Sequence, residues 1–94
     1  MTAGEPAAWT VYVLRCRDGS LYTGITNDLE SRMREHLEGK GSRYVRSRLP
    51  FKLAYEERAP DRSAALKREA AIKKMDRAGK MGLISGWARA IREP

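Results

Sequence analysis

The sequence is short of the residues that mark secreted and membrane proteins. It has a single cysteine, Cys16, among 94 residues, so neither an internal disulfide nor a cysteine-based zinc site can form. No apolar run is long enough to cross a membrane. The first residues also lack the basic start and apolar core of a secretion signal. These absences predict a cytoplasmic protein in a reducing compartment.

Acidic residues are too few to balance the basic ones. The chain has 19 Lys and Arg against 12 Asp and Glu, which gives a formal net charge of +7 at pH 7. This excess favours polyanionic partners. Charge alone does not separate nucleic acid from an anionic membrane surface.

One basic segment, residues 40–52, contains no acidic side chain and encloses Tyr44. Its basic residues are Lys40, Arg43, Arg46, Arg48 and Lys52. Cations interleaved with an aromatic ring suit phosphate contacts combined with base stacking, whereas the simpler interpretation is a solvated loop. We predict a nucleic acid partner, DNA first with RNA left open, and no membrane association.

Length and composition predict one globular domain. The chain is 41% hydrophobic and 33% charged, which is typical of a folded rather than a disordered protein. Residues 1–8 contain Gly4 and Pro6 and are expected to form a loosely ordered tail, which leaves residues 9–94 as the domain. We expect a monomer, and the sequence names no protein partner.

The most informative stretch is residues 10–24, where two apolar runs flank a turn sequence. A two-residue loop at Asp18-Gly19 would send Tyr12 and Tyr22 to opposite faces of a hairpin. A three-residue loop starting at Arg17, with Gly19 in the left-handed region, would pair Tyr12 with Gly24 and place both tyrosines on one face. We take the second register as our hypothesis, in which Tyr22 pairs with Leu14.

A helix is predicted after the polar residues 26–28, which supply N-cap chemistry, and it should end near the glycines at 39 and 41. Its inward stripe is expected to be Leu29, Met33 and Leu37. Arg32 and His36 lie one turn apart on an edge of that stripe, from which they can lean over the tyrosine face.

The remaining elements follow from the same patterns. A single turn after Ser42 precedes a strand in which Phe51, Leu53 and Tyr55 should share one buried face. A helix from about Pro60 to Met75 has the inward stripe Ala65, Leu66 and Ile72, with Glu69 between them. A buried carboxylate is normally ion-paired, hydrogen-bonded or metal-bound. After a break at Ala78-Gly79, a last helix should pack on the other side of the sheet through Leu83, Ile84, Trp87 and Ile91.

These features together resemble the GIY-YIG nuclease domain. Thr10-Val11-Tyr12 matches the first triplet and Tyr22-Thr23-Gly24 the second, and the match continues through Asn27, Arg32 and His36 to Glu69. The resemblance covers the chain from Trp9 onward and is greatest to small stand-alone bacterial members. It implies an α/β (α+β) fold with a three-stranded, mainly antiparallel sheet flanked by helices. Ile25 stands where some DNA-repair members carry a lysine.

The resemblance also implies hydrolysis of a phosphodiester with one divalent metal ion, Mg²⁺ or Mn²⁺. Glu69 would be the metal ligand and Tyr22 the general base, although a phenol of ordinary pKa, about 10, needs cations nearby to favour the phenolate. Tyr12 would orient water or phosphate, Arg32 would bind the scissile phosphate, and His36 would share proton transfer or hold the phosphate. Asn27 would hydrogen-bond the backbone turn or the substrate.

Each role has a structural alternative. Strand tyrosines often only pack, Asn27 can be the helix cap, and Glu69 can pair with Arg32 or Lys73 without any metal. We predict a metal-dependent endonuclease that cuts DNA in a basic cleft on the tyrosine face. The alternative is a non-catalytic module of the same fold that grips nucleic acid through its basic segment. The predicted nucleic acid contacts are Asn27, Lys40, Arg43, Tyr44, Arg46 and Arg48.

Overall fold

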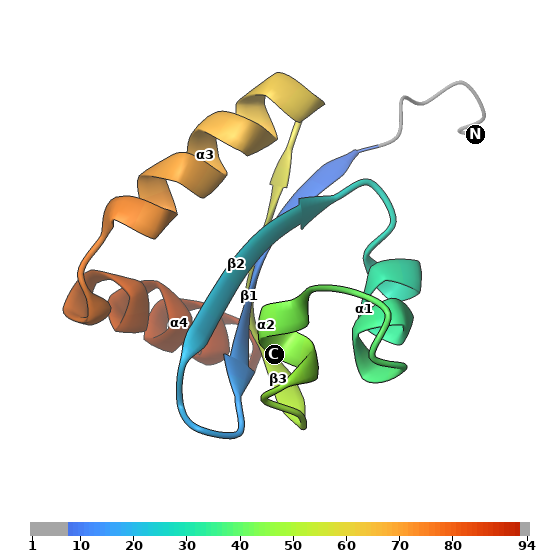
Figure 1. Ribbon diagram of the computed structural model, residues 1–94. Coiled ribbons are helices and arrows are strands. Elements are labelled where there is room, and N and C mark those ends of the chain that lie inside the picture. Colours follow the sequence, from blue (N-terminus) through green and yellow to red (C-terminus); the bar gives the residue numbers. More distant parts are fainter. Residues whose placement is uncertain (1–7, 93–94) are drawn as a thin grey trace.

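The computed structural model describes residues 8–92, so most of the tail predicted for residues 1–8 lies outside the described range. The elements in chain order are β1 (Trp9–Cys16), β2 (Leu21–Thr26), α1 (Leu29–Leu37), α2 (Arg43–Arg46), β3 (Phe51–Ala59), α3 (Arg62–Lys74) and α4 (Arg77–Arg92). The strands form one sheet in the order β2-β1-β3, and both pairings are antiparallel (Figure 1). The predicted α+β class, a three-stranded antiparallel sheet flanked by helices, is confirmed.

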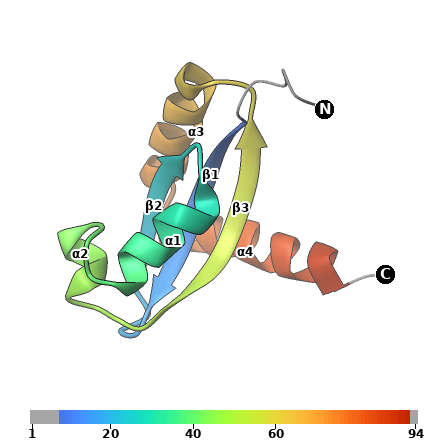
Figure 2. The same ribbon diagram turned by 90° about the vertical axis from the view of Figure 1, so that its right-hand side faces the viewer.

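The two faces of the sheet carry separate cores, because side chains alternate along the central strand β1. Val11 and Val13 pack against α3 and α4 through residues such as Ile72. Tyr12 and Leu14 point the other way and pack with Val45 of α2 and with residues of α1. Figure 2 shows α1 in front of the sheet and α3 behind it. The tyrosine core therefore lies under α1 and α2.

The β1–β2 hairpin has the three-residue loop that places both tyrosines on one face. Tyr12 pairs with Gly24, and Leu14 pairs with Tyr22. The Cys16 amide donates to the Ser20 carbonyl at 2.9 Å, which leaves residues 17–19 as the loop. Gly19 has a φ of 86°, a conformation that favours glycine. The hypothesis of the second register is confirmed.

Strand β3 does not have the single buried face that its sequence predicts. Val13 pairs with Tyr55 but Leu14 pairs with Leu53, so Ala54 is an extra residue at a β-bulge. Such a bulge reverses the alternation of side chains along one strand. Leu53 consequently faces the tyrosine core, as Phe51 does, whereas Tyr55 packs on the opposite face.

Helix α1 has the predicted limits, with Asp28 as N-cap and Gly39 at a φ of 77° just beyond its end. Its inward residues differ from the prediction at one position, because Leu37 is 62% exposed and His36 is buried in its place. The imidazole can be buried there because its Nε2 forms a hydrogen bond with the Tyr12 hydroxyl. The single helical turn after Ser42 is confirmed as α2.

The two C-terminal helices also depart from the predicted stripes. Leu66 is exposed on α3, and Ile91 is 61% exposed on α4, so neither belongs to the core. The predicted break at Ala78-Gly79 is wrong, because α4 already begins at Arg77. The Asp76 carboxylate accepts from the Gly79 amide at 2.8 Å, which caps the new helix and places Gly79 in its first turn.

As predicted, α4 lies on the face opposite the tyrosines, where Leu83 and Ile84 pack against the core that contains Val11 and Val13. Within residues 8–92, no helix combines the length and apolar character needed to span a membrane.

Candidate active site

Two tyrosine rings form the floor of the candidate site. Tyr12 of β1 and Tyr22 of β2 lie with ring centroids 6.5 Å apart and a 44° angle between their planes. Tyr12 is 1% exposed, whereas Tyr22 is half-buried at the margin of the core. The shared face follows directly from the loop length, so the hairpin sequence itself brings the two phenols together.

Helix α1 adds His36 to the tyrosines. The Tyr12 hydroxyl and His36 Nε2 are 3.0 Å apart, and the imidazole ring centroid lies 5.7 Å from that of Tyr22. Burial lowers the pKa of His36, because the charged imidazolium is disfavoured in the core, and the Arg32 cation lowers it further. The Tyr12 hydroxyl and Nε2 share one hydrogen bond whose direction follows the tautomer of the neutral imidazole, and Nδ1 is buried without a hydrogen-bond partner among the described residues.

Tyr12 is held in its protonated form. Burial raises the pKa of Tyr12, the Arg32 guanidinium partly opposes this rise, and the neighbouring Tyr22 and the Glu69 carboxylate add to it. A buried phenol with a raised pKa acts as a hydrogen-bond donor and orienting group, not as a base at neutral pH.

Arg32 lies one turn before His36 on α1, at the rim of the same cluster. Its guanidinium forms an ion pair with Glu35 at 3.1 Å, and its side chain is 32% exposed. The Tyr12 hydroxyl and Glu35 both raise the pKa of Arg32, so its positive charge is permanent. The site thus has a fixed cation at the opening of the tyrosine cluster.

Glu69 comes from α3, which covers the opposite face and contacts the edge strand β2. Its side chain is 19% exposed and pairs with Lys73 at 3.5 Å, so one of the two predicted ion pairs is present. Its charge raises the pKa of Tyr12, which puts the carboxylate within electrostatic reach of the cluster. Glu69 therefore comes from the helix on the face opposite the tyrosines, and its ion-pair partner is Lys73.

The residues present fit a hard divalent ion bound through few protein ligands. In the described part of the chain, no three His, Cys, Asp or Glu side chains converge to hold a metal ion. A single carboxylate oxygen completed by water and substrate oxygens is an ordinary set for Mg²⁺, whereas Zn²⁺ normally takes three or four protein ligands. Glu69, with its loose partner Lys73, is the group that fits.

The comparisons with known proteins show the family of the chain. The family model described as the GIY-YIG catalytic domain matches residues 8–82. The chain belongs to the GIY-YIG family. A UPF0213 protein of Xanthomonas axonopodis pv. citri is 42% identical over 85 residues, 90% of this chain and 83% of the relative. One from Syntrophus aciditrophicus is 52% identical over 75 residues, 79% and 86% of the two chains.

A solved structure gives the same answer for the fold. The solution NMR structure of a UPF0213 protein from Bacillus halodurans is 40% identical, covers 83% of each chain and has a TM-score of 0.55. The GIY-YIG domain implies a nuclease family. The UPF0213 names state no reaction.

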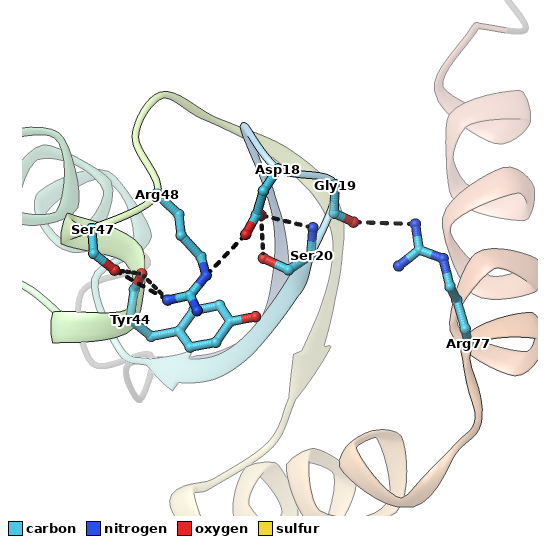
Figure 3. Close-up of polar contacts among 7 residues, drawn as sticks. All are labelled: Asp18, Gly19, Ser20, Tyr44, Ser47, Arg48 and Arg77. Atoms are coloured by element: carbon cyan, nitrogen blue, oxygen red, sulfur yellow. Dashed lines mark hydrogen bonds and ion pairs between the residues drawn. The ribbon is translucent and has the colours of Figure 1, made fainter.

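The basic segment of this GIY-YIG chain is divided between structural and free side chains. Arg48 pairs with Asp18 of the hairpin loop at 3.0 Å, and its guanidinium carbon lies 3.8 Å from the Tyr44 ring centroid (Figure 3). Tyr44 in turn stacks on Tyr22, with centroids 5.9 Å apart. Arg43 and Arg46 are exposed, and neither has an ion pair among the described residues. Arg48 therefore has a structural role, because it connects Tyr44 of α2 to the hairpin loop.

Lys40 and Asn27 are the two remaining residues that we predicted to contact nucleic acid. Lys40 pairs loosely with Glu38 at 3.7 Å. Asn27 is exposed, and the carboxylate that caps α1 belongs to its neighbour Asp28, which accepts from the Ser31 amide at 3.1 Å. The interpretation of Asn27 as the helix cap is therefore wrong, and its side chain is available to a substrate.

The sequence interpretation missed two glycines that make room for the buried pair. A Cβ on Gly24 would lie 2.5 Å from the Tyr12 hydroxyl oxygen, and one on Gly41 would collide with His36 Nδ1. We interpreted Gly41 only as a helix stop. The position of Gly41 in the sequence does not indicate a contact with the His36 imidazole, because only the folded chain brings the two residues together.

Proposed function

We propose that the chain is a metal-dependent endonuclease that hydrolyses phosphodiester bonds in DNA. The observation that supports this most is the division between the two tyrosines. Tyr12 is buried and bonded to His36, whereas Tyr22 is only half-buried. A fixed phenol beside an accessible one suits a reaction in which one orients and the other exchanges a proton.

In this proposal Tyr22 takes the proton from the attacking water. A phenol does this only as a phenolate, and Arg32 is the permanent cation of the cluster. Arg32 also binds the scissile phosphate through its planar fork, and Asn27 contacts the backbone beside it. Tyr12 and His36 hold the floor of the site in place.

Glu69 would hold the Mg²⁺ or Mn²⁺ ion. When bound, such an ion neutralises charge on the phosphoryl oxygens and on the departing oxygen. Lys73 would then give up its contact with Glu69 or share it.

A second candidate function is a binding module of the same fold that does not cut. The observation in its favour is the exposed patch on α2, where Arg43 and Arg46 flank a partly exposed Tyr44. Phosphate contacts from the two arginines, with a contact from the exposed part of Tyr44, would hold nucleic acid without any catalytic group. Lys40 would add a further phosphate contact.

The test is incubation with supercoiled plasmid, branched DNA, single-stranded DNA and RNA, in Mg²⁺, in Mn²⁺ and in EDTA. Glu69→Gln and Tyr22→Phe should each lose about 100-fold or more in rate. The matched controls are Glu30→Gln, an exposed carboxylate on α1, and Tyr55→Phe, a tyrosine on the other face. Equal nicking by all five proteins would indicate a contaminant, and salt-sensitive binding without cutting would favour the binding module.

The accompanying proposals are a monomer, a cytoplasmic location and no membrane contact. Sedimentation of the purified chain tests the first, and fractionation of cells that express it tests the other two.

A further inference from the structure

A hollow lies at the hairpin end of the sheet, outside the candidate active site. It encloses about 460 Å³ where the end of β1, the hairpin loop and the start of β3 meet. We call it the sheet-end pocket. Its lining residues are Arg15, Cys16, Arg17, Gly19, Pro50, Phe51 and Lys52.

The pocket gathers positive charge that the fold does not neutralise. Arg15 and Lys52 are directly opposite each other on β1 and β3, and like charges in that position destabilise a sheet. Neither they nor Arg17 form an ion pair with any residue that the structure describes. The loop carboxylate of Asp18 is already engaged by Arg48.

The fourth polar group of the lining carries no compensating charge. Burial raises the pKa of the Cys16 thiol, so it stays neutral at physiological pH. A neutral thiol is a poor nucleophile and metal ligand. The chemistry of the pocket is therefore that of an anion site with three cations.

Two contacts tie the sheet-end pocket to its surroundings. Arg77 at the start of α4 donates to the Gly19 carbonyl at 3.1 Å, which brings another cation to the hairpin loop (Figure 3). Phe51 lines the pocket and also lies 5.9 Å from the His36 ring, edge to face. One aromatic ring thus separates the pocket from the tyrosine cluster.

A hollow on α4 that also contains two arginines serves as a comparison for the sheet-end pocket. It encloses about 340 Å³ and is lined by Ser85, Ala88, Arg89 and Arg92, all from one helix face. Exposed cations on one helix are ordinarily solvated. The sheet-end pocket differs because two segments of the chain, 15–19 and 50–52, converge there and place like charges side by side.

We propose that the sheet-end pocket is a second phosphate-binding site, which holds the nucleic acid backbone beyond the segment that lies over Tyr22. The inference rests on the nucleic acid ligand of the proposed function. A bound phosphate relieves the repulsion between Arg15 and Lys52, so the unfavourable cross-strand pair becomes a favourable contact. Phe51 forms the boundary between the two sites.

The first test compares two double variants in a Glu69→Gln background, which prevents cutting. Arg15→Ala with Lys52→Ala empties the sheet-end pocket of two cations, and Arg89→Ala with Arg92→Ala removes the same charge from α4. Binding of a fluorescent DNA duplex is measured against salt concentration. The slope of log K against log salt should fall by about 2 for the pocket variant and change little for the control. Equal changes in the two variants would overturn the proposal.

The second test separates a nucleic acid site from a site for free anions. Amide signals of residues 15–17 and 51–52 are followed by NMR during titration with inorganic phosphate and with a short oligonucleotide. Shifts at lower concentration of the oligonucleotide support the proposal, and shifts at lower concentration of phosphate overturn it.

Cleavage is scored separately, with the Glu69 side chain restored. A wild type that does not cut, together with the expected difference in salt slope, would reject the endonuclease and leave the phosphate site standing. A wild type that cuts, together with equal slopes, would reject the phosphate site alone.

Discussion

The Tyr12 hydroxyl lies 3.0 Å from His36 Nε2, and each of the two side chains is 1% exposed. This bond joins the central strand to α1 across the tyrosine core. Gly24 closes the pair on the side of β2, and Gly41 closes it on the side of the loop after α1. Strand, helix and loop thus meet at one buried polar contact, whose loss would leave unsatisfied groups in the core.

The first prediction concerns pH. Burial lowers the pKa of His36 in the folded chain below its ordinary value of 6.5, so the unfolded state binds more protons between the two values. The free energy of unfolding should therefore rise as pH rises through this window and fall as pH drops below 6.5. The slope for one proton is at most about 1.4 kcal/mol per pH unit. Urea unfolding at a series of pH values measures it.

The matched control for this measurement is His36→Gln, which keeps an acceptor for Tyr12 but does not titrate. His36 is the one histidine of the chain, and the lowered pKa of Asp18 acts below 3.8, outside the window. The variant should show little pH dependence between about 5 and 7. An equal slope in both proteins would mean that another group is responsible.

The second prediction concerns the glycines around the buried pair. Gly24→Ala and Gly41→Ala each force a methyl group into Tyr12 or His36, and overpacking of this kind costs about 1–3 kcal/mol in unfolding free energy. Gly86→Ala is the control, because a Cβ there meets nothing within 4 Å. That helix substitution should stabilise the chain by up to about 1 kcal/mol. If all three variants unfolded alike, the space around the pair would not matter.

The sequence was sufficient for the parts of the fold that depend on near neighbours. The hairpin register follows from a loop of three residues and from the tolerance of Gly19 for a positive φ. The cap of α1 was narrowed to residues 26–28, and the turn after Ser42 was visible in the same way, because a cap depends on residues two or three positions away. The relative position of the two tyrosines was therefore predictable.

What sequence reasoning could not supply depends on contacts between distant segments. The bulge at Ala54 leaves no mark on the alternation of apolar and polar residues in β3. The choice of His36 over its neighbour Leu37 as the buried residue depends on Tyr12, which is 24 positions away. Basic residues that look equivalent in the segment 40–52 differ because Asp18 engages only Arg48.

The third prediction separates the structural from the binding role within that segment. Arg48→Ala removes the ion pair with Asp18 and the contact with the Tyr44 ring, so it should lower the unfolding free energy by about 1 kcal/mol. Arg46→Ala removes the same charge from an exposed site and should change it by less than about 0.5 kcal/mol. Chemical denaturation gives both values.

Binding should rank these two variants in the opposite way. Arg46→Ala should reduce the salt slope for DNA by about 1, as expected for one lost phosphate contact. Titration of a labelled duplex at several salt concentrations measures it. Loss of stability in Arg46→Ala, or no change in Arg48→Ala, would show that the division between structural and binding roles is wrong.

The last prediction tests whether loop length sets the position of the tyrosines. Deletion of Asp18 leaves two residues between Cys16 and Ser20, so the hairpin can keep a three-residue loop only by drawing Ser20 into it, which shifts the pairing of β2 by one position and turns Tyr22 away from Tyr12. Circular dichroism should still report a sheet and helices, while the NMR contact between the two rings and cleavage of DNA both disappear. Asp18→Ala is the control, because it removes the same carboxylate but keeps the loop length. It should retain the ring contact and cut within a few fold of wild type, whereas a deletion variant that still cuts would show that the loop does not fix the register.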